Sequence, residues 1–303
     1  MKKQDFLQLE GVSKQTLETL LERASFMKKS VLAHKPPQDI LKGKLVVTMF
    51  FENSTRTRCS FESAAKYLGA EVVSMSSAGS SVQKGENLLD TAITIDKMCP
   101  SAMVMRHSMS GAADFVAKNV KASVINAGDG QHAHPTQALL DMFTMKEYFG
   151  HIEGLTVAII GDIKYSRVVR SNIAGLTTMG AKVKVYGPGT LMPKDMDKLN
   201  CTVCNSIEEA ITGSDVVMGL RIQLERQSCS LLPSAGEYNK FYGINAERMK
   251  LANKGAIIMH PGPVNRGVEL SYDVLDTPIC YKDEQVTNGL SVRMALLEMV
   301  CKE

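Results

Sequence analysis

The chain has 303 residues, of which 44% are hydrophobic and 22% charged, the composition of a soluble globular protein. Its length exceeds what one compact core usually holds, so two α/β domains are expected. The net charge of +3 is too small to indicate binding to nucleic acid or to an anionic membrane. No stretch approaches the ~18 apolar residues of a membrane span, and the first residues lack the apolar region of a signal peptide, so we expect a cytoplasmic protein.

The seven cysteines do not form a disulfide framework, because their number is odd and they are scattered from Cys59 to Cys301. Cys201 and Cys204 make a single C-x-x-C without a second Cys/His pair nearby. We interpret them as two reduced cysteines on a strand, with zinc or redox use as the alternative.

The first elements are a helix, a strand and a second helix. Residues 13–33 show helical spacing of apolar side chains, and the apolar run 45–50 is typical of a buried parallel strand. A helix over 55–68 follows, and Gly69 stands where a helix-ending glycine is expected.

The turn between this strand and the second helix is the most informative stretch, Ser54-Thr55-Arg56-Thr57-Arg58. A strand-to-helix turn directs free N–H groups and the positive end of the helix dipole at one spot. Three hydroxyls and two guanidiniums crowd the same spot, so the sequence predicts a phosphate site. The alternative is an ordinary capped helix with solvated arginines.

Strands and helices then alternate: a strand over 71–75, a polar segment 76–86, a helix over 87–98, a strand over 101–105 that ends on Arg106, a helix over 114–119 and a strand over 122–128. Short connections between such elements predict a parallel sheet. The polar segment is either a mobile loop or a plain linker.

Polar residues collect after these strands, where open α/β sheets bind ligands. Arg106 follows one strand, and residues 130–137 follow another. Pro135 suits the first position of a helix, which places His134 and Gln137 at its N-terminus. Glu52 and Asp129 are the only carboxylates in these loops, so the positive charge at the site comes from arginine and no magnesium is expected.

A second domain begins near residues 150–154. It contains predicted strands over 155–160, 182–186, 215–220 and 256–259 and helices over 166–179 and 206–211. The G-x-G-x-x-G fingerprint is absent, which disfavours a dinucleotide. Arg167 and Arg221 follow strands of this domain; each alone is an ordinary solvated arginine, and together they suggest a second anion site. A last helix over 290–300 is expected to pack back on the first domain.

Two motifs identify a family. Ser54-Thr55-Arg56-Thr57-Arg58 with His134-Pro135-Thr136-Gln137 resembles the signature pair of the carbamoyltransferases. Residues 80–86 and 161–171 resemble the branch of that family that uses aspartate. His260-Pro261-Gly262-Pro263 stands where the ornithine branch has His-Cys-Leu-Pro.

The resemblance implies two doubly wound α/β parallel-sheet domains with an active-site cleft between them. Residues 1–149 would bind carbamoyl phosphate, with helix 289–303 packed on them, and residues 150–288 would bind aspartate. The implied reaction moves the carbamoyl group of carbamoyl phosphate to the α-amine of L-aspartate, giving N-carbamoyl-L-aspartate and phosphate in pyrimidine synthesis. No cofactor and no metal are implied.

The resemblance also implies a role for each site residue. The residues that bind carbamoyl phosphate would be Ser54, Thr55, Arg56, Thr57, Arg106, His134, Gln137, Pro261, Gly262 and Pro263. Those that bind aspartate would be Lys84, Arg167, Arg221 and Gln223. Catalysis would rest on Arg56, Thr57, Lys84, Arg106 and His134, by stabilising charge on the carbonyl oxygen and on the leaving phosphate.

Ser80 and Lys84 would enter the site of the neighbouring subunit, so the resemblance implies a homotrimer with shared active sites. Gly262 and the residues after it resemble the form that works without separate regulatory chains, and association with dihydroorotase stays open. The rival interpretations are a carbamoyltransferase for another amine, a non-catalytic binding protein of the same fold, and a dehydrogenase.

Overall fold

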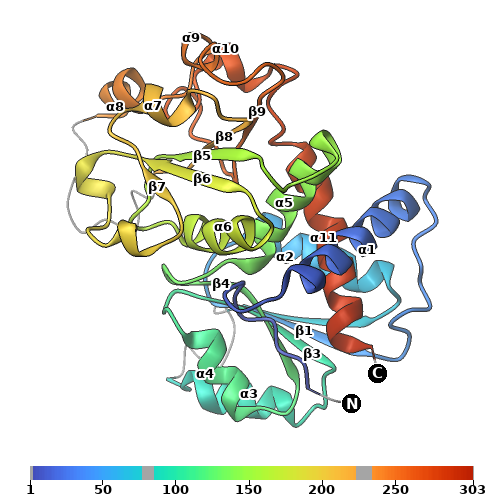
Figure 1. Ribbon diagram of the computed structural model, residues 1–303. Coiled ribbons are helices and arrows are strands. Elements are labelled where there is room, and N and C mark those ends of the chain that lie inside the picture. The colour runs from blue at the N-terminus through green and yellow to red at the C-terminus, as the bar shows by residue number, and fades with distance from the viewer. Residues whose placement is uncertain (1–2, 77–84, 223–233, 303) are drawn as a thin grey trace. The chain divides into compact units, whose positions relative to one another are not determined.

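The computed structural model describes residues 3–76, 85–222 and 234–302 (Figure 1). The chain divides into two compact units. Unit 1 is Met1–Phe143 with Val286–Glu303, and unit 2 is Thr144–Gln285. Within the described residues, no helix has both the length and the apolar character needed to cross a membrane.

Unit 1 is a parallel sheet between two layers of helices. Its strands are β1 (Leu45–Phe50), β2 (Glu71–Ser76), β3 (Ala102–His107) and β4 (Ser123–Asp129), in the order β2-β1-β3-β4. Its helices are α1 (Lys14–Leu32), α2 (Thr55–Tyr67), α3 (Leu88–Asp96), α4 (Ala112–Asn119), most of α5 (Pro135–Phe149) and most of α11 (Glu284–Cys301). Helices α3 and α4 cover one face of the sheet, and α1, α2 and α11 lie on the other (Figure 1).

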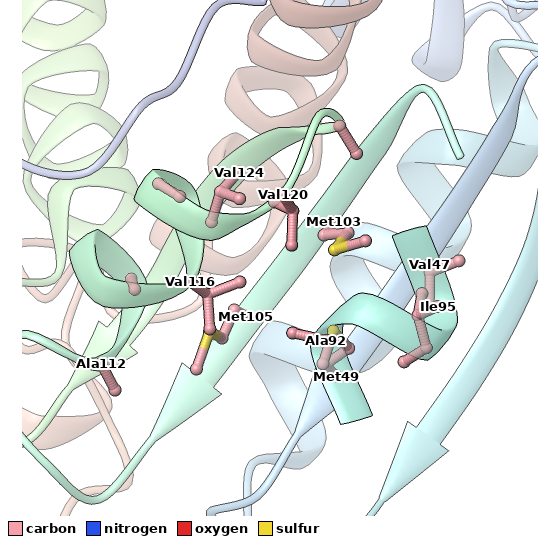
Figure 2. Packing of buried hydrophobic residues seen from close by; sticks show 13 residues of the cluster. Val47, Met49, Ala92, Ile95, Met103, Met105, Ala112, Val116, Val120 and Val124 are labelled. Atoms are coloured by element: carbon pink, nitrogen blue, oxygen red, sulfur yellow. The ribbon is translucent and has the colours of Figure 1, made fainter. Parts of the chain in front are cut away.

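Alternation along the strands produces the core of unit 1. Val47 and Met49 of β1 and Met103 and Met105 of β3 point to the same face, where they pack against α3 and α4 (Figure 2). Each of these side chains is at most 1% exposed. Burial of one such side chain contributes about 1.5–3 kcal/mol, so this layer holds the strands in register.

The predicted strand 45–50 and the start of α5 at Pro135 are confirmed. Gly69 is also confirmed as the residue that ends α2. Its φ is +85°, and a Cβ there would overlap the backbone of Gln38.

Unit 2 is a second parallel sheet, with the order β7-β6-β5-β8-β9. Its strands are β5 (Thr156–Ile160), β6 (Lys182–Tyr186), β7 (Thr202–Val203), β8 (Val216–Gly219) and β9 (Ile257–Met259). Its α-helices, besides the end of α5, include α6 (Arg167–Thr178), α7 (Ile207–Ile211), α8 (Ala235–Tyr242), α9 (Ala246–Met249) and α10 (Tyr272–Leu275), with short 3₁₀ turns at Gly189–Leu191 and Met196–Lys198.

Two differences from the sequence-based prediction concern helices. Helix α11 begins at Glu284, six residues before the predicted start at 290. The sequence did not indicate these first residues, because the first turn is polar and carries no apolar stripe. The sequence pattern places Val292, Ala295, Leu296 and Met299 on one face of this helix, but residues 291–298 are all buried, so burial is not confined to that face. The short helices α8, α9 and α10 were not predicted at all.

Candidate active site

The turn between β1 and α2 carries the predicted phosphate-binding residues. Ser54 is the N-cap of α2, but its side chain makes no hydrogen bond to the first turn. The N-cap side chains of α1, α3, α7, α8 and α9 do accept such a bond. The ordinary capping alternative therefore does not describe Ser54, and its hydroxyl is not committed to its own helix.

The side chains that follow Ser54 point in different directions. Thr55 and Arg56 are exposed, whereas Thr57 is buried. Arg58 forms an ion pair with Glu62 one turn along α2, with Nε 3.8 Å from the carboxylate. Arg58 is thus engaged by its own helix, and the candidate ligand-binding side chains of the first turn are those of Thr55, Arg56 and Thr57.

Arg106 stands beside this turn. In the β1–β3 ladder it lies opposite Phe50, and its carbonyl oxygen accepts a hydrogen bond of 2.9 Å from the Phe51 amide. Its side chain is 13% exposed and its Nε lies 3.4 Å from the Glu52 carboxylate. The guanidinium is therefore held next to the β1–α2 turn by both its backbone and its charge.

The loop between β4 and α5 is organised by Asp129, which is 1% exposed. Its carboxylate accepts hydrogen bonds from the amides of Gly111 (2.7 Å) and Ala133 (3.1 Å) and from the Asn126 side chain (2.8 Å). It also contacts Nδ1 of His132 at 3.0 Å. Asp129 was not predicted as an organising residue, since its partner Gly111 lies 18 positions earlier in the chain.

His134 and Gln137 lie at the N-terminus of α5, as predicted. The His134 carbonyl oxygen accepts from the amides of Gln137 (3.0 Å) and Ala138 (3.3 Å), which begins the helix. Both side chains are buried, at 5% and 7% exposure. The Gln137 Nε2 donates to the Asp141 carboxylate at 2.9 Å.

The structure brings these three segments to one edge of the sheet of unit 1. They lie at the ends of β1, β3 and β4, which are neighbours in the sheet and all parallel, so the carboxyl ends of these strands coincide. His107, at the end of β3, has its pKa lowered by burial, while Glu52 and Asp129 oppose that effect. The edge combines a helix N-terminus, two arginines and a buried histidine, which suits a phosphorylated ligand.

In unit 2, the two predicted arginines follow neighbouring strands. Arg167 opens α6 after β5 and is 3% exposed, and Arg221 follows β8. The Leu220 amide donates to the Ile160 carbonyl at 2.8 Å, so the two strand ends are joined directly. Gly161 allows that approach, because a Cβ there would lie 2.9 Å from the Leu220 carbonyl oxygen.

Glu269 supports the backbone next to Arg221. It is 2% exposed and accepts hydrogen bonds from the Ile222 amide (2.9 Å), the Asn265 amide (2.9 Å) and the Asn265 side chain (2.7 Å). Burial raises the pKa of this carboxyl, and the hydrogen bonds that it accepts oppose that rise. Sequence reasoning missed Glu269, because nothing near it in the chain indicates its partner Ile222.

The segment Pro261-Gly262-Pro263 follows β9. His260, 2% exposed, accepts a 2.9 Å hydrogen bond from the Gly262 amide at Nδ1, which leaves its ring proton on Nε2 in the neutral form. The His260 amide donates to Gln285 Oε1 at 2.9 Å. The peptide bond before Pro263 is cis and Gly262 has φ +64°.

Three predicted site residues, Ser80, Lys84 and Gln223, lie outside the described residues. Among the residues that are described, no group of three His, Cys, Asp or Glu side chains is arranged to hold a metal ion. Cys201 and Cys204 flank the edge strand β7, and burial raises the pKa of both thiols. A raised pKa disfavours the thiolate that metal binding and thiol exchange require.

Comparison with known proteins identifies both units. Residues 4–147 match the family described as "Aspartate/ornithine carbamoyltransferase, carbamoyl-P binding domain", and residues 153–300 match "Aspartate/ornithine carbamoyltransferase, Asp/Orn binding domain". The chain is 54% identical to the aspartate carbamoyltransferase catalytic subunit of Ruminiclostridium cellulolyticum, over 100% of this chain and 96% of that protein. It is 53% identical to the same subunit of Acetivibrio thermocellus, over 100% and 97%.

Solved structures agree. The aspartate transcarbamoylase of Trypanosoma cruzi in complex with N-(phosphonacetyl)-L-aspartic acid superposes with a TM-score of 0.90 and 33% identity, covering 99% of this chain and 96% of that one. The ornithine carbamoyltransferase of Pyrococcus furiosus gives a TM-score of 0.87 at 27% identity, over 98% and 97%. The chain therefore belongs to the aspartate/ornithine carbamoyltransferase family.

Proposed function

We propose that this chain transfers the carbamoyl group of carbamoyl phosphate to the α-amine of L-aspartate, giving N-carbamoyl-L-aspartate and phosphate. The observation that carries the proposal is the meeting of three segments at one sheet edge of unit 1. Ser54 to Thr57 follow β1, Arg106 lies at the end of β3 and His134 follows β4, and these three strands are adjacent.

The chemistry assigned to unit 1 is electrostatic. Ser54, Thr55, Arg56 and Thr57 bind the phosphate at the positive end of α2. Thr57, Arg106 and His134 donate to the carbonyl oxygen. That oxygen gains negative charge as the amine attacks, so these donors stabilise the transition state more than the bound substrate. Gln137 and the carbonyls of residues 261–263 orient the carbamoyl amine.

Arg167 and Arg221 are assigned to the two carboxylates of aspartate, with Lys84 and Gln223. A guanidinium matches a carboxylate in a paired geometry that an ammonium cannot reproduce. Both arginines follow adjacent strands of unit 2, and Glu269 fixes the backbone next to one of them. Aspartate, with two carboxylates, uses two such groups, whereas ornithine carries one carboxylate and a second amine.

Ornithine is the alternative acceptor. The relatives that match at 51–54% identity are named as aspartate carbamoyltransferase catalytic subunits, whereas the ornithine enzymes among the similar structures are 25–27% identical. The segment 260–263 lacks the cysteine of the ornithine motif. Both observations favour aspartate.

We further propose that the chain works in the cytoplasm, in pyrimidine synthesis, as a homotrimer in which Ser80 and Lys84 complete the site of the neighbouring subunit. Gly262 favours a trimer without regulatory chains, and association with dihydroorotase is a separate question for co-purification. No cofactor takes part in the proposed reaction.

The acceptor assay tests the proposed function. Purified protein is given carbamoyl phosphate with aspartate, ornithine or putrescine, and the carbamoylated product is quantified. We expect carbamoylaspartate in large excess. Faster carbamoylation of ornithine or putrescine would refute the assignment of the acceptor.

Subunit mixing tests the shared site. Inactive Lys84→Ala and Arg56→Ala proteins are dissociated, mixed in equal amounts and reassembled. A site that takes Arg56 from one chain and Lys84 from the next regains about one quarter of the native activity by random assortment in a trimer. No recovery after proven exchange would exclude the shared site.

A further inference from the structure

The C-terminal helix α11 places a charged side chain in the interior of unit 1. Arg293 is 4% exposed and lies against the helix that carries the proposed phosphate site. Its NH1 donates to the Ser60 hydroxyl of α2 at 2.9 Å, and its guanidinium lies 5.2 Å from the centre of the Phe61 ring. Gly289, one turn earlier, leaves the space that the guanidinium fills, since a Cβ there would lie 2.7 Å from NH1.

Asp141 of α5 is the carboxylate that accompanies this arginine. It is 0% exposed. Burial lowers the pKa of Arg293 to about 10, and the attraction of Asp141 opposes that decrease, so the guanidinium is charged at neutral pH. A buried cation stabilises the ionised form of a neighbouring carboxyl group. The charges of Arg293 and Asp141 therefore attract one another.

An ionised carboxylate can only accept hydrogen bonds. The 2.9 Å contact between Asp141 and the Gln137 side chain must therefore be made by the amide NH₂ of Gln137. The opposite end of the same amide, Oε1, is then turned away from Asp141. An oxygen in that position accepts a hydrogen bond and cannot donate one.

A carbamoyl group differs from other acyl groups in ending in NH₂. If Asp141 were neutral or absent, the Gln137 amide could rotate by 180° and offer its own NH₂ to the ligand, which a carbamoyl amine cannot accept. The orientation of one amide thus decides whether the site prefers an N–H donor, and that orientation depends on two residues with no role in the proposed reaction.

We propose that Asp141 and Arg293 are positioning residues that fix the Gln137 amide and so make the site selective for carbamoyl phosphate over acyl phosphates without an N–H. The inference rests on the proposed function only for the location of carbamoyl phosphate next to Gln137. It extends that function from what the site binds to what it rejects.

The test compares two stable ligands that differ in one group. Phosphonoacetamide ends in NH₂ and phosphonoacetone in CH₃, and neither needs aspartate. Calorimetric titration gives the Kd of each, and their ratio measures the preference. In Asp141→Leu/Arg293→Met, both charges are replaced by apolar groups, a change that buried ion pairs often tolerate. We expect the preference to fall about tenfold, the effect of one hydrogen bond.

A matched control removes another arginine–carboxylate pair that involves α11. Arg23 and Glu298 pair at 2.6 Å between α1 and α11, and Glu298 also accepts a hydrogen bond from Lys302, the residue after α11. Arg23→Met/Glu298→Leu should keep the native preference. A loss of preference in this control as large as in the Asp141/Arg293 variant would mean general loosening of α11 and would refute the inference.

A double-mutant comparison shows whether the effect passes through Gln137. Gln137→Met should abolish the preference, and adding Asp141→Leu/Arg293→Met should then change nothing further. An unchanged preference in Asp141→Leu/Arg293→Met, or an additional loss in the Gln137→Met background, would overturn the inference.

The outcomes separate the two proposals. A native protein that prefers phosphonoacetamide but does not carbamoylate aspartate would refute the proposed function, while the variants still decide the inference. A native protein that carbamoylates aspartate and shows no preference between the two phosphonates would refute the inference alone.

Discussion

Gly130 gives the sharpest test of how the loop before α5 positions His134. Its φ of +46° is uncommon for residues with a side chain, and a Cβ there would lie 2.5 Å from the backbone nitrogen of Ser110 and close to its Oγ. Ordinary contact begins at 3.4 Å, so the two loops would have to separate by about 0.9 Å. Asp129 ties the same loops together through the amides of Gly111 and Ala133, which prevents either from moving alone.

Gly130→Ala should therefore displace His134 by a substantial fraction of that distance. A misplacement of about 1 Å at a catalytic group costs on the order of 100-fold in rate. We expect kcat/KM, from initial rates of carbamoylaspartate formation, to fall by about that factor.

Gly111→Ala is the matched control for this substitution. Gly111 has φ +82°, but a Cβ added there would meet nothing within 4 Å, so the change costs about 1 kcal/mol of backbone strain and leaves kcat/KM nearly unchanged. A Gly130→Ala enzyme as active as Gly111→Ala would refute the reasoning.

Four further predictions follow, two of them with a control substitution. Arg56→Ala should lower kcat/KM at least about 100-fold, because it removes a charged donor from the proposed phosphate site. Arg58 pairs with Glu62 on its own helix, so Arg58→Ala should stay near native in the same assay. Arg221→Ala should raise the KM for aspartate about 10- to 100-fold, the effect of losing a hydrogen bond to a carboxylate. The KM for carbamoyl phosphate should not change equally, and equal changes would refute the assignment of Arg221 to aspartate. Gly150→Ala should lower the Tm by about 2–4 °C, because a Cβ at 150 meets nothing within 4 Å. Gly69→Ala should lower the Tm by much more, because a Cβ at 69 overlaps Gln38. Similar calorimetric Tm values for the two variants would contradict this. Burial raises the pKa of Glu269 in the folded chain above its ordinary 4.5, so the folded chain binds this proton more tightly than the unfolded chain does. The folded chain therefore loses stability as the pH rises from 4.5 through the folded pKa. The urea midpoint of Glu269→Gln, relative to that of the native chain, should rise over the same pH range, and a constant difference would refute the shift.

Local patterns sufficed for most elements. Residues 45–50 are apolar except for Thr48, because β1 has neighbours on both sides and helices on both faces. A run of that length and composition is typical of such a strand. Pro135 and Gly69 constrain the backbone by their own chemistry, so their positions at a helix start and end were readable without any partner. The convergence of Arg106 and His134 on one edge followed from the parallel sheet alone.

The supporting residues were not predictable in the same way. Asp129 joins amides that are 18 positions earlier and 4 positions later in the chain, and the Glu269 carboxylate meets an amide 47 positions away. Arg293 meets Ser60 across 233 positions. Each is a charged residue whose type suggests the surface, and only the folded chain shows that it is buried among donors or acceptors.

The strand between the two cysteines of the C-x-x-C shows the same limit. Both cysteines were predicted to lie on a strand, but β7 comprises only Thr202–Val203 between them. A two-residue edge strand pairs with one neighbour, β6, so its sequence carries too little alternation to set its length.

The order of synthesis matters for unit 1, which holds the proposed phosphate site. Unit 2 is continuous in sequence, whereas unit 1 needs both the first 143 residues and those from Val286 onward. Domains usually fold as they leave the ribosome, the earlier one first. Here unit 2 can be complete before unit 1, because the faces of α2 and α5 that become buried stay uncovered until Arg293 and the rest of α11 have been made. A growing chain thus exposes the apolar side of unit 1 until the residues from Val286 onward have been made, and a chaperone would be needed most during that interval.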